Sequence, residues 1–226
     1  MMVNQEQINT LKMAIENRLN LGEKQIGWKL GFGSPGGLRA LGISRPLVGA
    51  LFDKGEIIDG NEIDISSMAD PRVEAEIAAH IDKDIPNDAT FNQIKASVSS
   101  LVPAIELVDF HSPPSNPVNV LSDNIYQRGW VISPCCDSRW QEGANGLSIS
   151  VSMADEIWEP FNDIESQIGL LSDNLDECNK IASSLGRGIL GGDIILLGSV
   201  IPPHPINGKE FVVDMAGRGR ISLKFK

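Results

Sequence analysis

The sequence is poor in cysteine, in positive charge and in long apolar runs, and each shortage excludes a class of protein. Its 226 residues include 19 lysines and arginines against 30 aspartates and glutamates, and the formal net charge is -11. Nucleic-acid phosphates demand a basic surface, so a nucleic-acid partner is excluded. No apolar stretch approaches the roughly 18 residues that span a bilayer, so we also expect no membrane protein.

The three cysteines, Cys135, Cys136 and Cys178, form an odd set with one adjacent pair. This pattern favours a reducing compartment over a disulfide framework. The adjacent pair also lacks the spacing of zinc ligands. The N-terminal stretch has neither the apolar core nor the small-residue cleavage site of a secretory signal, so we predict a cytoplasmic location.

The length suits one domain with a full core, or one domain with a small helical appendage. Residues 4–20 place apolar side chains at three- and four-residue intervals, which predicts an amphipathic helix. We therefore expect an N-terminal helical segment, residues 1–24, packed on a domain formed by residues 25–226. The apolar side chains of the predicted helix are Ile8, Leu11, Ile15 and Leu19.

Strand patterns dominate the remainder, with a helix expected early in residues 87–110 and another at about Leu175–Leu185. Many strands, three or four helices and no repeat indicate an α+β fold with a strand-dominated core. The strands are predicted in residues 25–32, 71–81, 102–110, 129–133, 146–153, 193–201 and 210–215.

The connections are predicted from their turn residues. Residues 39–51 are expected to form a turn region, and the Asp-Gly pair within residues 56–66 predicts a β-hairpin. Residues 111–124 are rich in proline, serine and asparagine, so we expect a loop there that could close over a binding site.

The segment Gly31–Gly36 reads GFGSPG and matches the GxGxxG dinucleotide fingerprint, with Asp53 about twenty residues further on. However, Pro35 and Gly42 leave room for barely two helical turns, whereas a Rossmann unit needs a full crossover helix. We therefore interpret the segment as a glycine-rich active-site or surface loop and keep nucleotide binding only as an alternative.

Residues 71–81, PRVEAEIAAHI, place Glu74 and Glu76 on one face of a predicted strand. Such close carboxylates repel each other unless a cation or several donors intervene. Glu106 lies in a second apolar strand, where an unpaired glutamate is rare. Three carboxylates on two strands suit a hard divalent cation, so Mg²⁺ or Mn²⁺ is predicted.

Two questions stay open at this carboxylate cluster. The glutamates could form a solvated strand face, although interleaved lysines would then be expected and only Arg72 is near. His80 continues the strand on the face of Glu76, and it is either a further ligand or a packed residue at the rim.

Five segments resemble, in order and spacing, successive blocks of the 2-keto-4-pentenoate hydratase family of the fumarylacetoacetate hydrolase superfamily, which includes 2-oxo-hepta-3-ene-1,7-dioate hydratases and 4-oxalocrotonate decarboxylases. The resemblance implies an α+β fold, a fumarylacetoacetate hydrolase-like mixed β-sandwich roll or barrel with flanking helices. It also implies one divalent ion and a homo-oligomer. The five segments are GWKLGF, PRVEAEIAAHI, VPAIELVDF, SDN and residues 191–225.

The resemblance also assigns roles to residues. Lys29 matches the active-site lysine of the family, and its alternative is an ordinary surface lysine on a strand edge. His111 is a weaker candidate for the base. The matched metal ligands are Glu74, Glu76 and Glu106, and the matched substrate-binding residues are Ser199, Asp123 and Asn124.

The function implied is hydration of a 2-hydroxy-dienoic or 2-keto acid through a metal-stabilised enolate. The alternatives are decarboxylation of a 4-oxalocrotonate-like oxo-diacid and hydrolysis of an acylpyruvate C–C bond. Three family positions differ, because this chain has Leu47 for an acidic residue, Ile125–Gln127 for a serine-rich segment, and Leu197 for a threonine. A non-catalytic partner subunit or ligand sensor is therefore a further alternative.

Overall fold

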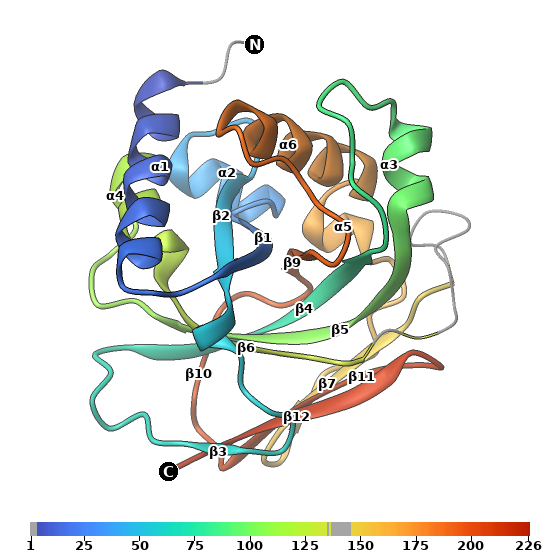
Figure 1. The fold of residues 1–226 in the computed structure, drawn as a ribbon. Helices are drawn as coiled ribbons and strands as arrows, with labels where there is room; N and C mark the ends of the chain where they lie inside the picture. Colours follow the sequence, from blue (N-terminus) through green and yellow to red (C-terminus); the bar gives the residue numbers. More distant parts are fainter. Residues whose placement is uncertain (1–3, 135, 137–145) are drawn as a thin grey trace.

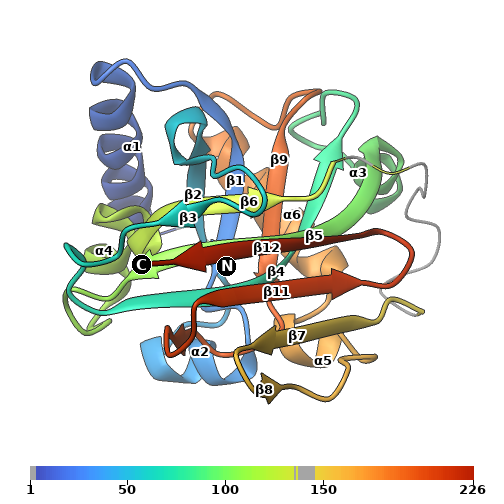
Figure 2. The same ribbon diagram turned by 90° about the horizontal axis from the view of Figure 1, so that it is seen from below.

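Two β-sheets and a layer of helices make up the molecule, and the computed structural model describes residues 4–134, 136 and 146–226. Figure 1 shows α1, α6 and α3 on one side of the molecule and the smaller sheet on the opposite side. Figure 2 shows that smaller sheet across the front, with the long strands β4 and β5 behind it. Strands β11 and β12 contact β5, so the two sheets share a core.

The larger sheet has seven strands in the order β2-β1-β9-β4-β5-β6, with β10 paired to β4. It curls into a half-barrel, as the differing directions of β1, β9 and β4 in Figure 2 show. Its strands are β1 Gln25–Gly31, β2 Leu47–Phe52, β4 Pro71–Ile81, β5 Val98–Asp109, β6 Gln127–Ile132, β9 Ile194–Ser199 and β10 His204–Pro205.

The smaller sheet has five strands in the order β3-β12-β11-β7-β8. Alternate side chains of β11 and β12 are buried, including Phe211 and Leu223, because one face of this sheet packs on the core. Its strands are β3 Glu62–Ile63, β7 Ile149–Met153, β8 Glu156–Ile157, β11 Glu210–Met215 and β12 Gly219–Phe225.

The helices connect and cover these sheets. In the described part of the chain, no helix combines the length and apolar character needed to cross a membrane. The α-helices are α1 Gln5–Asn20, α2 Pro35–Leu41, α3 Phe91–Ser97, α4 Pro117–Ser122, α5 Glu165–Ile168 and α6 Leu171–Ser184, and the 3-10 turns are η1 Asp53–Gly55 and η2 Asn124–Tyr126.

The predicted N-terminal helix is confirmed as α1. The side chain of Asn4 caps it by accepting a hydrogen bond from the Glu6 backbone N–H at 3.0 Å. Ile8, Leu11 and Ile15 are buried, whereas Leu19 is 44% exposed, so the apolar face ends one turn earlier than the spacing predicted. The helix packs against α4.

Several predicted connections are wrong. Residues 39–51 contain the buried strand β2 rather than a turn region, and β2 pairs antiparallel with β1. The hairpin in residues 56–66 is absent, because β3 pairs in parallel with β12. Ile57, Ile63 and Ile65 pack against the main core.

The glycine-rich segment does not form a dinucleotide fold. The helix that follows it, α2, has seven residues, and β1 runs antiparallel to the next strand, β2. A Rossmann unit requires parallel strands joined by a long crossover helix. The nucleotide-binding alternative is therefore wrong, and the segment instead lines a cavity together with Lys29.

The predicted loop at residues 111–124 contains the short helix α4. Asn116 caps this helix by accepting a hydrogen bond from the Asn119 backbone N–H at 2.9 Å, and Pro117 occupies its first turn. Val120 and Leu121 are buried in an apolar cluster with Leu47 and Tyr126. This packing holds the segment against the body.

Candidate metal centre and cavity

Three carboxylates meet at the middle of the larger sheet. Glu74 of β4 is the register partner of Glu106 on β5, and Glu76 follows on the same face of β4. Each glutamate offers one oxygen, and these oxygens lie within 4.8 Å of one another. Glu76 and Glu106 are both 1% exposed, and Glu74 is partly buried. The alternative of a solvated strand face is therefore wrong.

Burial and mutual repulsion make these carboxylates hard to ionise. Burial first, and the charge of Glu106 second, raise the pKa of Glu74 from its ordinary 4.5 to about 8. The same two causes, with a further contribution from Glu74, raise the pKa of Glu76 well above its ordinary value. The Lys29 ammonium opposes both shifts but supplies one positive charge against three carboxylates.

A divalent cation fits this donor set. The cluster contains oxygen donors alone, which hard cations such as Mg²⁺ and Mn²⁺ prefer over the nitrogen and sulfur donors that zinc commonly takes. Two positive charges would offset the excess negative charge that burial makes costly.

Lys29 lies beside the cluster and is itself 1% exposed. Its β1 strand runs between β2 and β9, so the alternative of a surface lysine on a strand edge is wrong. The Lys29 ammonium forms an ion pair with Glu106 and donates a longer hydrogen bond to the Ile125 carbonyl at 3.4 Å. A buried ammonium is thus held next to the three carboxylates.

A cavity of about 500 Å³ opens onto Lys29, Glu74 and Glu76. Its walls come from the glycine-rich segment after β1, from α5, and from the end of β9 with the residues that follow. Ser199 lines it and donates a hydrogen bond to the Ala75 carbonyl at 3.1 Å. The apolar side chains on its walls are Leu30, Phe32, Phe110, Ile125, Ile168, Leu197, Val200 and Ile201.

Asp123 and Asn124 lie outside the lining of this cavity. Asn124 is buried, and its amide is paired with the Ala50 backbone, accepting from the N–H at 2.9 Å and donating to the carbonyl at 2.8 Å. Asp123 forms an ion pair with Arg128 at 2.9 Å. Their role in binding substrate stays a prediction.

The two candidate histidines are also apart from the carboxylates. The His80 Nε2 atom contacts the Ser133 carbonyl at 3.1 Å, and His80 is not part of the metal-ligand group. The His111 side chain is 45% exposed, lies 3.6 Å from Asp123 and does not line the cavity.

The site also contains a contact that the sequence did not predict. Gln127 donates a hydrogen bond from Nε2 to Glu106 Oε1 at 3.0 Å. Just before it, Asn124, Ile125 and Tyr126 have φ values of 47°, 56° and 60°, a left-handed turn that costs about 1–2 kcal/mol per residue. Asparagine tolerates this conformation, but isoleucine and tyrosine rarely adopt it, so the sequence does not predict it at Ile125 and Tyr126.

Two glycines make room for this turn. A Cβ atom on Gly31 would lie 2.6 Å from Ile125 Cγ2, and one on Gly49 would lie 2.8 Å from Asn124 Oδ1.

Leu47, by contrast, lines a separate cavity of about 360 Å³ between α1 and α6. Of the three positions that differ from the family, Ile125–Gln127 and Leu197 therefore contact the carboxylate site, and Leu47 does not. Cys135 lies outside the described residues.

The curled sheet, the second sheet against it, the flanking helices and the central carboxylates together define a fumarylacetoacetate hydrolase-like α+β fold. Solved structures confirm this fold. A 4-oxalocrotonate decarboxylase from Pseudomonas putida G7, complexed with magnesium and adipate, superimposes with a TM-score of 0.86 at 20% identity, covering 97% of this chain and 85% of that one. A fumarylpyruvate hydrolase from Pseudomonas aeruginosa, complexed with Mn²⁺ and pyruvate, gives 0.67 at 14% identity and covers 88% of each chain.

Sequence relatives confirm the predicted resemblance. A 4-oxalocrotonate decarboxylase from Pseudomonas sp. is 28% identical over 191 residues, covering 83% of this chain and 73% of the relative. A 2-keto-4-pentenoate hydratase from Paraburkholderia xenovorans is 26% identical over 233 residues, covering 93% of this chain and 80% of the relative. No family model matches the chain. These relatives are enzymes, and they include both a hydratase and a decarboxylase.

Proposed function

We propose that this chain is a divalent-metal-dependent hydratase of 2-hydroxy-dienoic or 2-keto acids. The observation that carries the proposal is the buried group of three glutamates with Lys29 beside it, of which Glu74, Glu76 and Lys29 line a cavity. The proposal includes the homo-oligomeric state and the cytoplasmic location expected from the sequence.

Glu74, Glu76 and Glu106 would hold the ion, which we take to be Mg²⁺ or Mn²⁺. The magnesium and Mn²⁺ complexes of the two structural neighbours support this assignment. When bound, such an ion supplies positive charge that stabilises an enolate oxygen beside the substrate carboxylate.

The residues of the chain supply the remaining functions. Lys29 is the group placed to move a proton at the substrate or to hold its carboxylate, because it is buried beside the glutamates and lines the cavity. The Ser199 hydroxyl lies on the same wall and offers an oxygen that can contact substrate. The apolar walls keep bulk water away from the reacting carbons, which strengthens each of these polar interactions.

The charges around the cavity favour a substrate with one carboxylate. Among the described lining residues, Lys29 is the only cation, and it lies next to the glutamates. A second carboxylate at the far end of an oxo-diacid would be placed against neutral walls without a cationic partner, which is costly. This observation favours hydration of a mono-acid over decarboxylation of a 4-oxalocrotonate-like diacid.

Decarboxylation is the second candidate, supported by the decarboxylase among the relatives. Hydrolysis of an acylpyruvate is less favoured, because it requires a histidine and glutamate pair to activate water. None of the three histidines lines the cavity in the part of the chain that the structure describes.

A proton NMR time course tests the function. Metal-stripped protein is mixed with 2-hydroxypenta-2,4-dienoate, 4-oxalocrotonate and an acylpyruvate, and Mg²⁺ is then added. We expect the dienoate to be consumed and hydrated only after the addition. Consumption of 4-oxalocrotonate instead would identify the decarboxylase, and persistence of all three compounds together with bound metal would favour a non-catalytic ligand sensor or partner subunit.

A further inference from the structure

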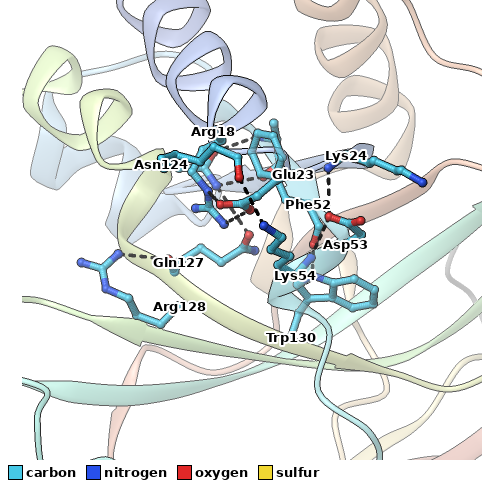
Figure 3. Close-up of polar contacts among 12 residues, drawn as sticks. Arg18, Glu23, Lys24, Phe52, Asp53, Lys54, Asn124, Gln127, Arg128 and Trp130 are labelled. Atoms are coloured by element: carbon cyan, nitrogen blue, oxygen red, sulfur yellow. Dashed lines mark hydrogen bonds and ion pairs between the residues drawn. The ribbon is translucent and has the colours of Figure 1, made fainter.

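Gln127 is a buried amide in direct contact with the candidate metal centre. It is 6% exposed and opens β6, where it is the register partner of Val108 on β5, two residues from Glu106. Its Nε2 donates to Glu106 Oε1 at 3.0 Å, and its Oε1 lies 3.5 Å from the Asn124 Nδ2 that donates to it. Figure 3 shows the Asn124 and Gln127 side chains pointing toward each other.

The two oxygens of Glu106 are therefore not equivalent. Oε1 accepts from both Lys29 and Gln127, whereas no described hydrogen bond reaches Oε2. A carboxylate oxygen already occupied by an ammonium and an amide is a poor metal ligand, since its lone pairs are engaged. Oε2 is thus the oxygen left to face a cation held with Glu74 and Glu76.

The backbone before Gln127 fixes the position of this amide. Asn124 is held at both polar atoms of its side chain by the Ala50 backbone, and residues 124–126 are in the left-handed conformation. Gly49 leaves the space that the Asn124 side chain occupies. Strained backbone of this kind persists where the surrounding structure holds it, and here it delivers Gln127 to Glu106 and the Ile125 carbonyl to Lys29.

We propose that Gln127 is a positioning residue that, together with Lys29, holds Glu106 Oε1 so that Oε2 is presented to the divalent ion. The proposal rests on the proposed function, because it presumes that the three glutamates bind a metal. Groups that contact metal ligands orient them, and removing such a group typically weakens metal binding 10- to 100-fold.

Titration calorimetry of metal-stripped protein with Mn²⁺ tests the proposal. Gln127→Met keeps the approximate length of the side chain and removes its donor, so Glu106 is held by Lys29 alone and can turn either oxygen toward the ion. We expect the Kd for Mn²⁺ to rise about 10- to 100-fold. If this variant fails to fold, Gln127→Asn keeps the amide but shortens its reach, and the same rise is expected.

Asn179→Leu is the matched control, because Asn179 is a buried amide on α6 that donates to the Pro86 carbonyl at 3.1 Å and lines neither cavity. It should lower the melting temperature without changing the Mn²⁺ affinity. Equal affinity losses in Gln127→Met and Asn179→Leu would overturn the positioning role, as would a folded Gln127 variant within twofold of wild type. Absence of Mn²⁺ binding by the wild type would instead refute the proposed function itself, and this inference with it.

Discussion

Glu76 is one of the two most deeply buried carboxylates of the site. It is 1% exposed, and its Oε2 accepts a hydrogen bond from the Gly198 backbone N–H at 2.8 Å. Glu76→Gln keeps the shape of the side chain but removes the charge that a divalent cation requires. We expect Mn²⁺ binding in calorimetry and turnover in the NMR assay to be lost together.

The control for that substitution is Glu177→Gln, which makes the same chemical change at the second cavity, where Glu177 pairs with Arg45 at 2.7 Å. It should leave both metal binding and turnover unchanged. Turnover by metal-free Glu76→Gln protein would contradict the metal-dependent mechanism.

The role of Lys29 at the substrate is tested at a Mn²⁺ concentration that keeps the metal site filled. Lys29→Met preserves the length of the side chain and removes the ammonium, which the proposed function uses at the substrate. Loss of a proton-transferring group typically lowers kcat by about 10² to 10⁴-fold. We expect that loss of kcat at saturating Mn²⁺, and we also expect a higher Kd for Mn²⁺, because Lys29 holds Glu106 Oε1 together with Gln127. A variant with wild-type kcat would exclude Lys29 from the chemistry.

Single residues of the site could be predicted where the pattern that identifies them lies within a few neighbouring residues of the sequence. Glu74 and Glu76 were predicted to share a face because strand periodicity is local, and Glu106 because a glutamate is conspicuous in an apolar strand. Gln127 gave no such signal, because its contact with Glu106 depends on the pairing of β5 with β6 and on a left-handed turn at Ile125 and Tyr126.

At the scale of elements, the parallel pair of β1 and β9 places Lys29 one strand away from β4, because β9 lies between β1 and β4. A Cβ atom added at Gly27 would lie 1.9 Å from the Ile194 carbonyl oxygen, which is backbone and cannot swing aside. Gly27→Ala should therefore push the two strands apart and lower the free energy of unfolding by about 3 kcal/mol, the upper range for overpacking. Urea denaturation measures this change.

Gly36→Ala is the appropriate comparison for Gly27→Ala. The atom nearest to a Cβ at Gly36 is the Ser34 Oγ at 3.9 Å, and the residue lies in α2, where alanine is favoured. We expect a small gain of about 0.4–1 kcal/mol in the free energy of unfolding. Equal effects of the two substitutions would show that the close approach of β1 and β9 does not govern the result.

Elements with a local signal were predicted well, and those that depend on distant partners were not. The alternation in β4 and the helical spacing in α1 are complete within the segment itself, and both elements were predicted close to their observed bounds. The turn assigned to residues 39–51 and the hairpin assigned to residues 56–66 failed, because β2 is buried against β1 and β3 pairs with the distant strand β12. Sequence alone does not show which strands will be neighbours.

At the scale of the whole molecule, the carboxylate cluster should make stability depend on pH. The pKa of Glu74 is raised from 4.5 to about 8, and that of Glu76 is raised in the same direction. Below about pH 4.5 these groups are protonated in both the folded and the unfolded states. As the pH rises toward 8 the unfolded chain releases the protons first, so the free energy of unfolding falls.

For metal-free protein we expect a loss of at least about 1.4 kcal/mol between pH 5 and pH 8, the equivalent of one pKa unit, measured by urea denaturation at each pH. In Glu76→Gln the loss should be smaller, because one of the repelling carboxylates has gone.

Mn²⁺ at about 100 times its Kd should add about 2.7 kcal/mol to the free energy of unfolding of wild type at pH 8. The gain should shrink at pH 5, where protons compete for the same oxygens. Stability that stayed level across this range, or an equal Mn²⁺ effect in Glu76→Gln, would show that the three glutamates are not the metal site.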